Sequence, residues 1–207
     1  MHHMRQPVLE ARAGADSISQ AIGGRVRQGR GSRGWTLDQL AGRSGVSRRM
    51  LISIEQGSAN PSIATLLRIS DALGIGLPAL VNMDRSPGLR VTRAGAAPVL
   101  WRGKAGGRAV LVAGTEPPDV TELWDWTLGP GENHSSEAHT AGTRELLFVL
   151  DGQLELRVGQ HAEVLATGDS ASFAGDLAHE YVNASSAQVA RFTLTVFEPT
   201  VGGDAAR

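Results

Sequence analysis

The first 81 residues carry hydrophobic positions at the spacing of an α-helix. Ile18, Ile22 and Val26 recur every fourth residue, which places them on one face of a first helix. Three further helical patterns follow, each opened by an N-cap residue and closed by a glycine, and a short fifth one begins near Pro78. These three patterns cover residues 36–44, 47–56 and 63–73. The pattern therefore predicts a bundle of five short helices.

Beyond residue 93 the hydrophobic period changes to two. Leu154, Leu156 and Val158 alternate with polar residues, which is typical of a strand with one buried face. Asp151-Gly152 separates two such strands and favours a tight hairpin turn, because both turn residues must accept a positive φ. The expected strands cover residues 108–113, 122–128, 145–150, 153–158, 161–166, 170–173, 179–183 and 189–197. No helical pattern interrupts them, so a β-sandwich or barrel is predicted.

The change of period predicts two domains, one all-α and one all-β. We expect the helical domain at residues 16–81 and the β domain at 98–199, joined by a linker at 82–97 that contains Pro87-Gly88. Residues 1–15 are expected to form a disordered N-terminus and residues 200–207 a loose C-terminus.

Composition narrows the class of protein. Cysteine is absent, which excludes a disulfide scaffold, a thiolate zinc finger and a cysteine nucleophile, and fits a cytoplasmic location. There is no run of about 18 apolar residues and no apolar signal segment at the start, so we expect neither a membrane partner nor secretion.

The net charge of −1 conceals an asymmetry between the two halves. Residues 1–81 contain ten arginines and five acids, whereas residues 82–207 contain ten basic residues and sixteen acids, giving net charges of +5 and −6. A positive helical half is typical of a domain that faces an anion such as nucleic acid.

The helices predicted at 36–44 and 47–56 form a candidate helix-turn-helix around Gly45. On a helical wheel of the second helix, Leu51 and Ile54 gather on one side and Arg49 lies on the other, with Arg48 flanking at the start. Arginine can donate two hydrogen bonds to one guanine, and a helix N-terminus favours phosphate. The second helix is therefore predicted to enter the major groove of DNA.

This region, from about Ile18 to Val81, resembles the lambda-repressor-like helix-turn-helix domains of the XRE family of transcriptional regulators. The matching motifs are Leu40-Ala41, Gly45-Val46-Ser47, Ile54-Glu55-x-Gly57, Asn60-Pro61-Ser62, Leu66 and Leu73-Gly74. The resemblance implies a homodimer on double-stranded operator DNA and an ion pair between Arg30 and Glu55. It implies base contacts by Arg48, Arg49 and Ser53, and phosphate contacts by Thr36, Gln56, Ser58 and Asn60. Leu37 departs from the polar residue often found at its position.

Histidine and glutamate residues of the β half are candidates for a second site. Imidazole and carboxylate groups from several strands of a small barrel can converge on a divalent metal or on an organic ligand. The candidates by spacing are His139, Glu145 and His179, whereas His134 is expected in a loop. Trp124 shares a face with Trp126 and Leu128 and is expected in the core.

The spacing around these residues resembles the cupin family, a double-stranded β-helix jelly roll. Gly152 follows Glu145 after six residues, and Asn183 follows His179 after three. The resemblance implies that His139, Glu145 and His179 occupy three of the four metal-ligand positions. The departures are Ala141 at the second histidine, Ala174 in place of proline and Asp176 in place of glycine.

The three residues that keep a ligand side chain could hold a metal whose coordination shell is completed by water. They could equally line a pocket and bind an organic effector. We expect the effector pocket and no resident metal. The two resemblances together predict a DNA-binding transcriptional regulator whose cupin domain senses a small molecule, with no catalytic residues. The alternative is a cupin metalloenzyme, a dioxygenase or an isomerase, with a DNA-binding appendage.

Overall fold

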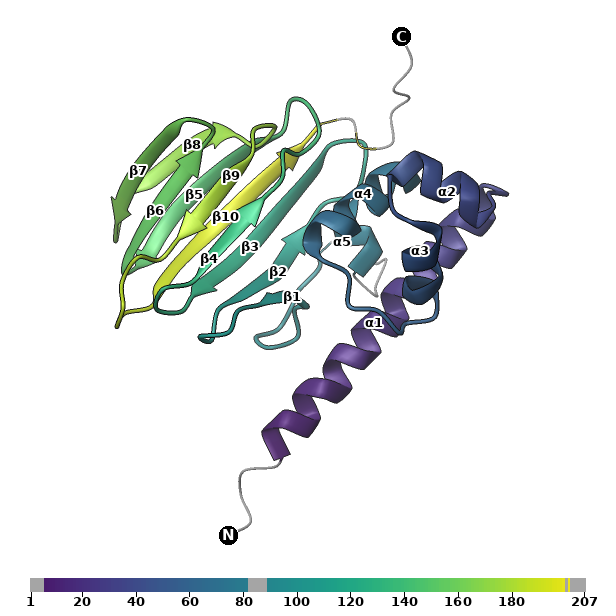
Figure 1. Ribbon diagram of the computed structural model, residues 1–207, viewed down its shortest axis with the longest axis horizontal. Helices are drawn as coiled ribbons and strands as arrows, with labels where there is room; N and C mark the ends of the chain where they lie inside the picture. The colour runs from purple at the N-terminus through teal and green to yellow at the C-terminus, as the bar shows by residue number, and fades with distance from the viewer. Residues whose placement is uncertain (1–5, 82–88, 200, 202–207) are drawn as a thin grey trace. The chain divides into compact units, whose positions relative to one another are not determined.

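The computed structural model describes residues 6–81, 89–199 and 201, with side chains from residue 18 onward. It contains two compact units, Met1–Arg85 and Ser86–Arg207, the first helical and the second made of strands (Figure 1). The predicted combination of an all-α and an all-β domain is confirmed. None of the described helices is long and apolar enough to cross a membrane.

The helical unit contains the five predicted helices. They are α1 (Gln6–Ser32), α2 (Leu37–Ser44), α3 (Arg48–Glu55), α4 (Ile63–Leu73) and α5 (Gly76–Val81). Thr36, Ser47 and Ser62 cap α2, α3 and α4, because each side-chain oxygen accepts a hydrogen bond from a backbone N–H of the first turn. Gly45 and Gly74 end α2 and α4 in the left-handed conformation, which glycine adopts without strain.

Helix α1 begins ten residues earlier than expected. Residues 6–15 were predicted to be disordered, but they belong to the helix. The stretch Leu-Glu-Ala-Arg-Ala at residues 9–13 has high helix propensity, and Pro7 lies in the first turn, where proline is tolerated. Only residues 1–5 of the predicted disordered segment lie outside the described part of the chain.

Gly23 allows α1 to pass close to α3. A Cβ atom at Gly23 would lie 2.2 Å from the carbonyl oxygen of Ile54, whereas one at Gly24 would meet nothing within 4 Å. Apolar side chains from all five helices form the core around this contact. Those with no exposed surface include Val26, Leu40, Leu51, Ile69, Leu73, Leu77 and Leu80.

The β unit consists of two antiparallel sheets. Its strands are β1 (Val99–Arg102), β2 (Arg108–Gly114), β3 (Val120–Leu128), β4 (Asn133–Ser136), β5 (Arg144–Asp151), β6 (Gln153–Val158), β7 (His161–Ala166), β8 (Ser170–Ala174), β9 (His179–Val182) and β10 (Ala190–Glu198). One sheet has the order β1-β2-β3-β10-β5-β8 and the other β4-β9-β6-β7. Neighbours that are distant in sequence, such as β3 and β10, are typical of a jelly roll.

All eight predicted strands are present, and their ends lie within two residues of the predicted bounds. Strands β1 and β4 were not predicted. The expectation that His134 lies in a loop is wrong, because the polar sequence Asn-His-Ser-Ser of β4 pairs with β9, with His134 opposite Tyr181. Backbone hydrogen bonds between β4 and β9 hold these four residues in a strand, although their sequence has low β propensity.

The ends of the β domain differ in part from the prediction. Residues 82–88 of the expected linker lie outside the described residues, and residues 89–97 contain neither helix nor strand. Val201 was predicted to be loose but is buried, and its N–H donates to the carbonyl oxygen of Pro118 at 2.7 Å. The other predicted loose residues beyond 199 are outside the described part.

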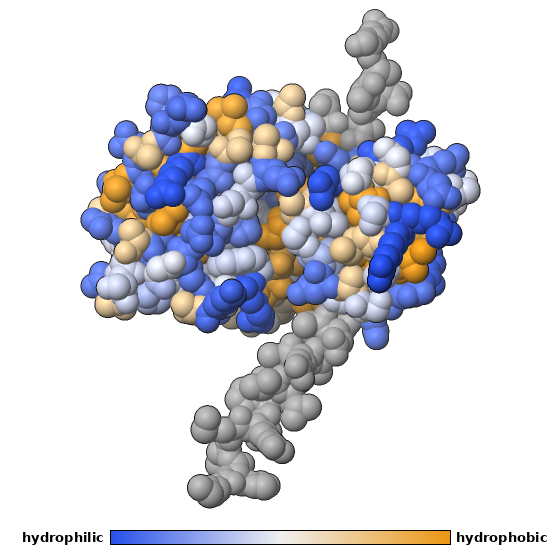
Figure 2. Space-filling view, viewed as in Figure 1, coloured by the Kyte–Doolittle hydropathy of each residue, from blue (hydrophilic) through white to orange (hydrophobic). Residues whose placement is uncertain are grey.

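The core of the β unit lies between the inner faces of the two sheets. Alternate residues of β3, β5 and β10 are buried, as the period of two predicted. Trp124 and Trp126 are both buried, which confirms that they are core residues. Over the β unit as viewed in Figure 2, hydrophobic residues (orange) are interspersed with hydrophilic ones (blue).

Candidate functional sites

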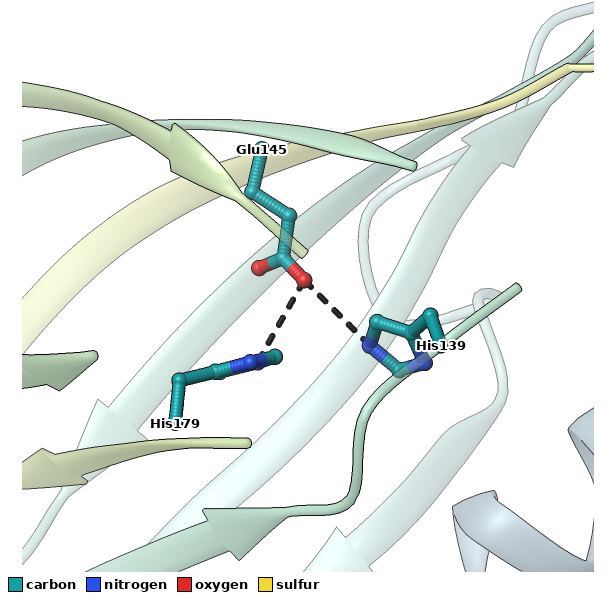
Figure 3. Close-up of side chains that lie close together, drawn as sticks. All are labelled: His139, Glu145 and His179. Carbon is teal, nitrogen blue, oxygen red and sulfur yellow. Dashed lines mark ion pairs between the residues drawn. The ribbon is translucent and has the colours of Figure 1, made fainter. Parts of the chain in front are cut away.

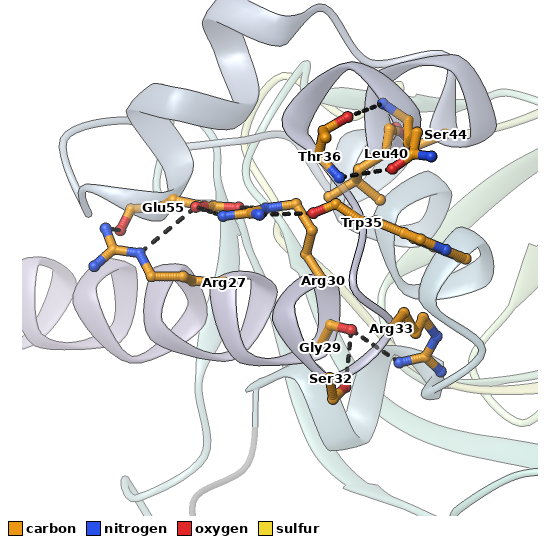
Figure 4. A network of polar contacts seen from close by, with 11 residues as sticks. Arg27, Gly29, Arg30, Ser32, Arg33, Trp35, Thr36, Leu40, Ser44 and Glu55 are labelled. Atoms are coloured by element: carbon orange, nitrogen blue, oxygen red, sulfur yellow. Dashed lines mark hydrogen bonds and ion pairs between the residues drawn. The ribbon is translucent and has the colours of Figure 1, made fainter.

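The predicted ion pair between Arg30 and Glu55 is confirmed (Figure 4). Nε of Arg30 donates to Oε1 of Glu55 at 2.6 Å, and Nη2 donates to Oε2 at 2.8 Å. Nη2 of Arg27 adds a 2.8 Å hydrogen bond to the backbone oxygen of Glu55. The hydrogen bond with Glu55 raises the pKa of Arg30 above its ordinary value. This bidentate contact fixes the C-terminal end of α3 on α1.

The first turn of α3 presents two arginines to solvent. Arg48 and Arg49 directly follow the N-cap Ser47, and both are exposed. Nε of Arg48 lies 3.2 Å from Oδ1 of Asp38 on α2, a contact between two solvent-exposed side chains. Ser53 is half-buried one turn after Arg49, and its hydroxyl donates to the carbonyl oxygen of Arg49 at 3.3 Å. The predicted base-contacting residues thus all belong to α3.

The four predicted phosphate-contacting residues are exposed at the ends of α2 and α3 and in the loop that follows α3. They are Thr36, Gln56, Ser58 and Asn60. The Thr36 hydroxyl accepts a hydrogen bond from the N–H of Gln39 at 3.2 Å, and the Thr36 N–H donates to Oε1 of Gln39 at 2.8 Å. The Ser58 hydroxyl donates to the carbonyl oxygen of Ser53 at 3.1 Å.

The structure brings together the three candidate residues of the β unit (Figure 3). His139 lies in the loop between β4 and β5, Glu145 on β5 and His179 on β9. Oε1 of Glu145 lies 3.2 Å from Nε2 of His139 and 3.3 Å from Nε2 of His179. All three ligand atoms lie within 4.8 Å of one another, and the Glu145 side chain is fully buried.

Two neighbours orient this trio. The Tyr181 hydroxyl donates to Oε2 of Glu145 at 2.6 Å, and Nδ1 of His179 lies 2.8 Å from the carbonyl oxygen of Leu177. Because a carbonyl only accepts, Nδ1 of His179 carries a proton, so in the neutral imidazole Nε2 is the nitrogen with the lone pair. Burial, and then the charge of Glu145, raises the pKa of Tyr181 well above its ordinary value. Sequence reasoning did not identify Tyr181, although it lies two residues beyond His179 and therefore on the same strand face.

His134 lies beside the trio in an aromatic cluster. Its ring centroid is 4.7 Å from that of Trp126 and 5.1 Å from that of Trp101. Burial, and then the proximity of His179, lowers the pKa of His134 to about 4, so the ring is neutral at pH 7. The indole Nε1 of Trp126 is buried and has no hydrogen-bond partner.

A second carboxyl group is buried in the same barrel. Nε1 of Trp124 donates to Oε2 of Glu122 at 2.9 Å, while Oε1 of Glu122 has no hydrogen-bond partner. Burial, and then the charge of Glu198, raises the pKa of Glu122 to about 8. Sequence reasoning missed Glu122, although its phase with Trp124, Trp126 and Leu128 marks it as inward-facing.

The cupin resemblance implies a divalent metal, and the residues present fit one. Two imidazole nitrogens and one carboxylate oxygen converge, and Oε1 of Glu145 is buried without a hydrogen-bond partner. This donor set suits first-row divalent metals. Ala141 is exposed in the loop before β5 and offers no fourth donor. His139, Glu145 and His179 would hold such an ion, with its other positions left to water or ligand atoms.

Comparison with known proteins matches both units. Residues 26–80 match the helix-turn-helix family, and residues 124–197 match the cupin domain family. The chain is 28% identical over 171 residues to the HTH-type transcriptional regulator SutR of Escherichia coli (strain K12), covering 81% of this chain and 90% of SutR. It is 34% identical over 71 residues to the uncharacterised HTH-type transcriptional regulator y4dJ of Sinorhizobium fredii, covering 34% of this chain and 92% of y4dJ.

A solved structure shares the fold. The crystal structure of an HTH_3 family transcriptional regulator from Vibrio cholerae superposes with a TM-score of 0.66 at 24% sequence identity. The match covers 89% of this chain and 99% of that one, so it extends over both units.

Proposed function

The chain belongs to the HTH-type transcriptional regulators, with an XRE-type helix-turn-helix domain followed by a cupin domain, and we propose that the barrel senses a small-molecule effector that changes its affinity for operator DNA. The observation that carries the sensing proposal is the convergence of His139, Glu145 and His179 inside the barrel. We place its action in the cytoplasm, where the operator is accessible.

For DNA recognition we propose that α3 lies in the major groove. Arg48 and Arg49 occupy its exposed first turn, where the positive end of the helix dipole adds to their charge. In this placement Arg48, Arg49 and Ser53 contact base edges, while the exposed residues at the ends of α2 and α3 contact phosphates. The phosphate group comprises Thr36, Gln56, Ser58 and Asn60.

We further propose that the regulator is a homodimer. One helix-turn-helix covers a half-site, and two half-sites one helical turn apart need two copies. Exposed large apolar side chains on the outer face of β3, β5 and β10 support pairing through the β unit. They are Leu123, Leu146, Phe148, Leu150 and Phe197.

The effector is proposed to bind at the trio rather than to be transformed there. Ala141 removes the fourth donor that the cupin resemblance implies for a catalytic metal. Any effector bound in the barrel acts on DNA binding only through its different affinity for two conformations of the protein. A divalent cation, if held by the trio, supplies a Lewis-acidic centre to which oxygen or nitrogen atoms of the effector can bind.

Operator binding with and without effector tests this proposal. A thermal-shift screen of metabolites would first identify a compound that stabilises the full chain. We expect His179→Ala to abolish the response of operator affinity to that compound and to leave the affinity of the free protein within about twofold. If the folded variant still responds fully, or loses operator binding without effector, the effector site lies elsewhere.

An oxygenase is the second candidate function. Two histidines and one carboxylate also form the donor set of non-haem iron oxygenases. Oxygen consumption by the Fe(II)-loaded protein in the presence of the compound found in the screen, lost in Glu145→Gln, would favour the enzyme.

A further inference from the structure

The two carboxylate oxygens of Glu145 have different surroundings. Oε2 accepts the Tyr181 hydroxyl at 2.6 Å. Oε1 lies between the Nε2 atoms of His139 and His179 and has no hydrogen-bond partner. Figure 3 shows this oxygen pointing toward both imidazoles. A buried carboxylate oxygen without a donor is costly, so the arrangement points to a missing partner at Oε1.

We propose that Tyr181 is the positioning residue of a divalent-cation site: its hydroxyl occupies Oε2 of Glu145 and thereby presents Oε1, together with the two imidazoles, to the metal. This inference replaces the expectation that the trio holds no resident metal, and it deepens the proposed function, since it rests on the trio being a binding site. Tyr181 itself does not touch the cation. It acts through Glu145, as hydrogen-bonding partners of metal ligands do in other proteins.

The phenol is held firmly enough for this role. Tyr181 is only 1% exposed, and its ring packs against those of His179, Trp126 and Phe192 at centroid distances of 5.2–5.7 Å. It shares one face of β9 with His179, two residues away, so the same strand carries a ligand and the donor that orients another ligand.

The second histidine is also prepared for a cation. The contact between Nδ1 of His179 and the carbonyl oxygen of Leu177 selects the tautomer whose Nε2 is unprotonated. A proton shared between Glu145 and a histidine would satisfy Oε1 only in part, because neither Nε2 contact has hydrogen-bond geometry. Nε2 of His139 already lies 3.4 Å from the Ser136 hydroxyl, so the atom that a cation among the three would satisfy is Oε1 of Glu145.

Metal affinity of the full chain tests the role of Tyr181. The protein is stripped with a chelator and titrated at pH 7.5 with Zn²⁺ by calorimetry and with Co²⁺ by visible absorption. We expect Tyr181→Phe to weaken binding of both ions by about 10–100-fold and to change the Co²⁺ spectrum, because the carboxylate is no longer oriented. Glu145→Gln should abolish binding. Ser44→Ala, which removes a buried hydroxyl hydrogen bond in the helical unit, should bind as the wild type does.

A second readout separates positioning from a general loss of structure. Tyr181 is the only tyrosine of the chain, so protein labelled with ¹³C at the tyrosine ζ carbon gives one signal. Zn²⁺ should shift this signal in the wild type, because the metal withdraws charge from the carboxylate to which the phenol donates.

Three results would overturn the inference: no metal binding by the wild type, wild-type affinity in Tyr181→Phe, or an unmoved tyrosine signal in the Zn²⁺-loaded protein. The sensing proposal would survive each of them, because an organic effector can bind the trio without metal. That proposal fails separately, through the His179→Ala measurement on operator DNA.

Discussion

Glu122 and Glu145 lie on either side of the same residue of β10: Val196 pairs with Glu122 of β3 and with Glu145 of β5. Both carboxyl groups are buried, and the β unit has no lysine or arginine among its described buried charged residues. Burial disfavours the charged form of Glu122, and the charges of Glu198 and then of Glu145 add to this effect, so Glu122 binds a proton more tightly than in water. The pKa of Glu122 is raised to about 8.

Replacing Glu122 should therefore change how stability depends on pH. A folded-state pKa of about 8, against an ordinary value of 4.5, means that the folded protein binds this proton more tightly than the unfolded chain. The stabilising contribution is complete below pH 4.5 and is lost as the pH rises toward 8. We expect Glu122→Gln to melt near the wild-type temperature at pH 5 and several degrees above it at pH 9, measured by circular dichroism. Glu163→Gln on exposed β7 is the control, and equal melting curves at pH 9 would contradict the assignment.

Gly23 and Gly24 form a matched pair for testing the contact between α1 and α3. A methyl group at Gly23 would collide with the backbone oxygen of Ile54, so Gly23→Ala should destabilise the helical unit by about 1–3 kcal/mol. The same change at Gly24 meets open space and should stabilise the helix by about 0.5–1 kcal/mol. Urea denaturation measures both. Equal effects of the two substitutions would show that the helices do not approach at Gly23.

Removing one partner of the Arg30–Glu55 ion pair should lower the free energy of unfolding substantially. Glu55 is buried, so Arg30→Ala removes both short hydrogen bonds to its carboxylate and leaves it only the longer contact with Nε of Arg27 at 3.5 Å; we expect the free energy of unfolding to fall by about 3 kcal/mol. Arg157 makes comparable contacts with Glu155 and Glu180 on the surface, where water screens the charges, so Arg157→Ala should lower the free energy of unfolding much less than Arg30→Ala does. Denaturant titrations that give the same loss for both variants would contradict the difference in burial.

Arg49 should discriminate bases, whereas Gln56 should not. Arg49→Ala is expected to weaken binding to the cognate operator by about 1–3 kcal/mol and to relax preference at one base pair. Gln56→Ala should weaken binding evenly across sequences, because a phosphate contact carries no base information. Fluorescence anisotropy on operator variants measures this, with Arg157→Ala as the control. Unchanged affinity and selectivity in Arg49→Ala would place the recognition surface elsewhere.

Phe148 tests the proposed dimer. It is 44% exposed on the outer face of β5, beside Leu146 and Leu150. A charge there should prevent burial against a second copy, so Phe148→Glu is expected to be a monomer of 21.8 kDa at micromolar concentration by light scattering, against a dimer for the wild type. Val164→Glu, on the exposed edge strand β7, should remain dimeric. A wild-type monomer would refute the dimer itself.

Periodicity predicted the fold well because burial repeats along each element. Together with the capping residues, it predicted all five helices and eight of the ten strands. It failed at β4, where four polar residues form a strand only because β9 supplies backbone partners, and at the start of α1, where no apolar period marks the helix. The local hydrophobic pattern shows neither the pairing of β4 with β9 nor the start of α1.

The same limit applies to the barrel site. The spacing of His139, Glu145 and His179 selected three residues that the structure brings together. It could not select Tyr181 or Glu122, whose roles depend on which strand lies across the sheet and on the absence of water. Motif spacing identifies only the three candidate ligand residues. The residues that surround them are determined by which strands pair in the folded sheet.

The hydrogen bonds at the helix ends imply that a phosphate contact by Thr36 and one by Ser58 would differ in free-energy cost. The Thr36 hydroxyl takes part in its cap as an acceptor, so its proton stays available to a phosphate oxygen while α2 remains capped. The Ser58 hydroxyl already donates its hydrogen bond to the carbonyl oxygen of Ser53, so it would have to rotate away before it could donate to DNA. In the proposed phosphate contacts, Thr36 would gain a hydrogen bond without losing one, whereas Ser58 would exchange its hydrogen bond with the carbonyl oxygen of Ser53 for one to DNA.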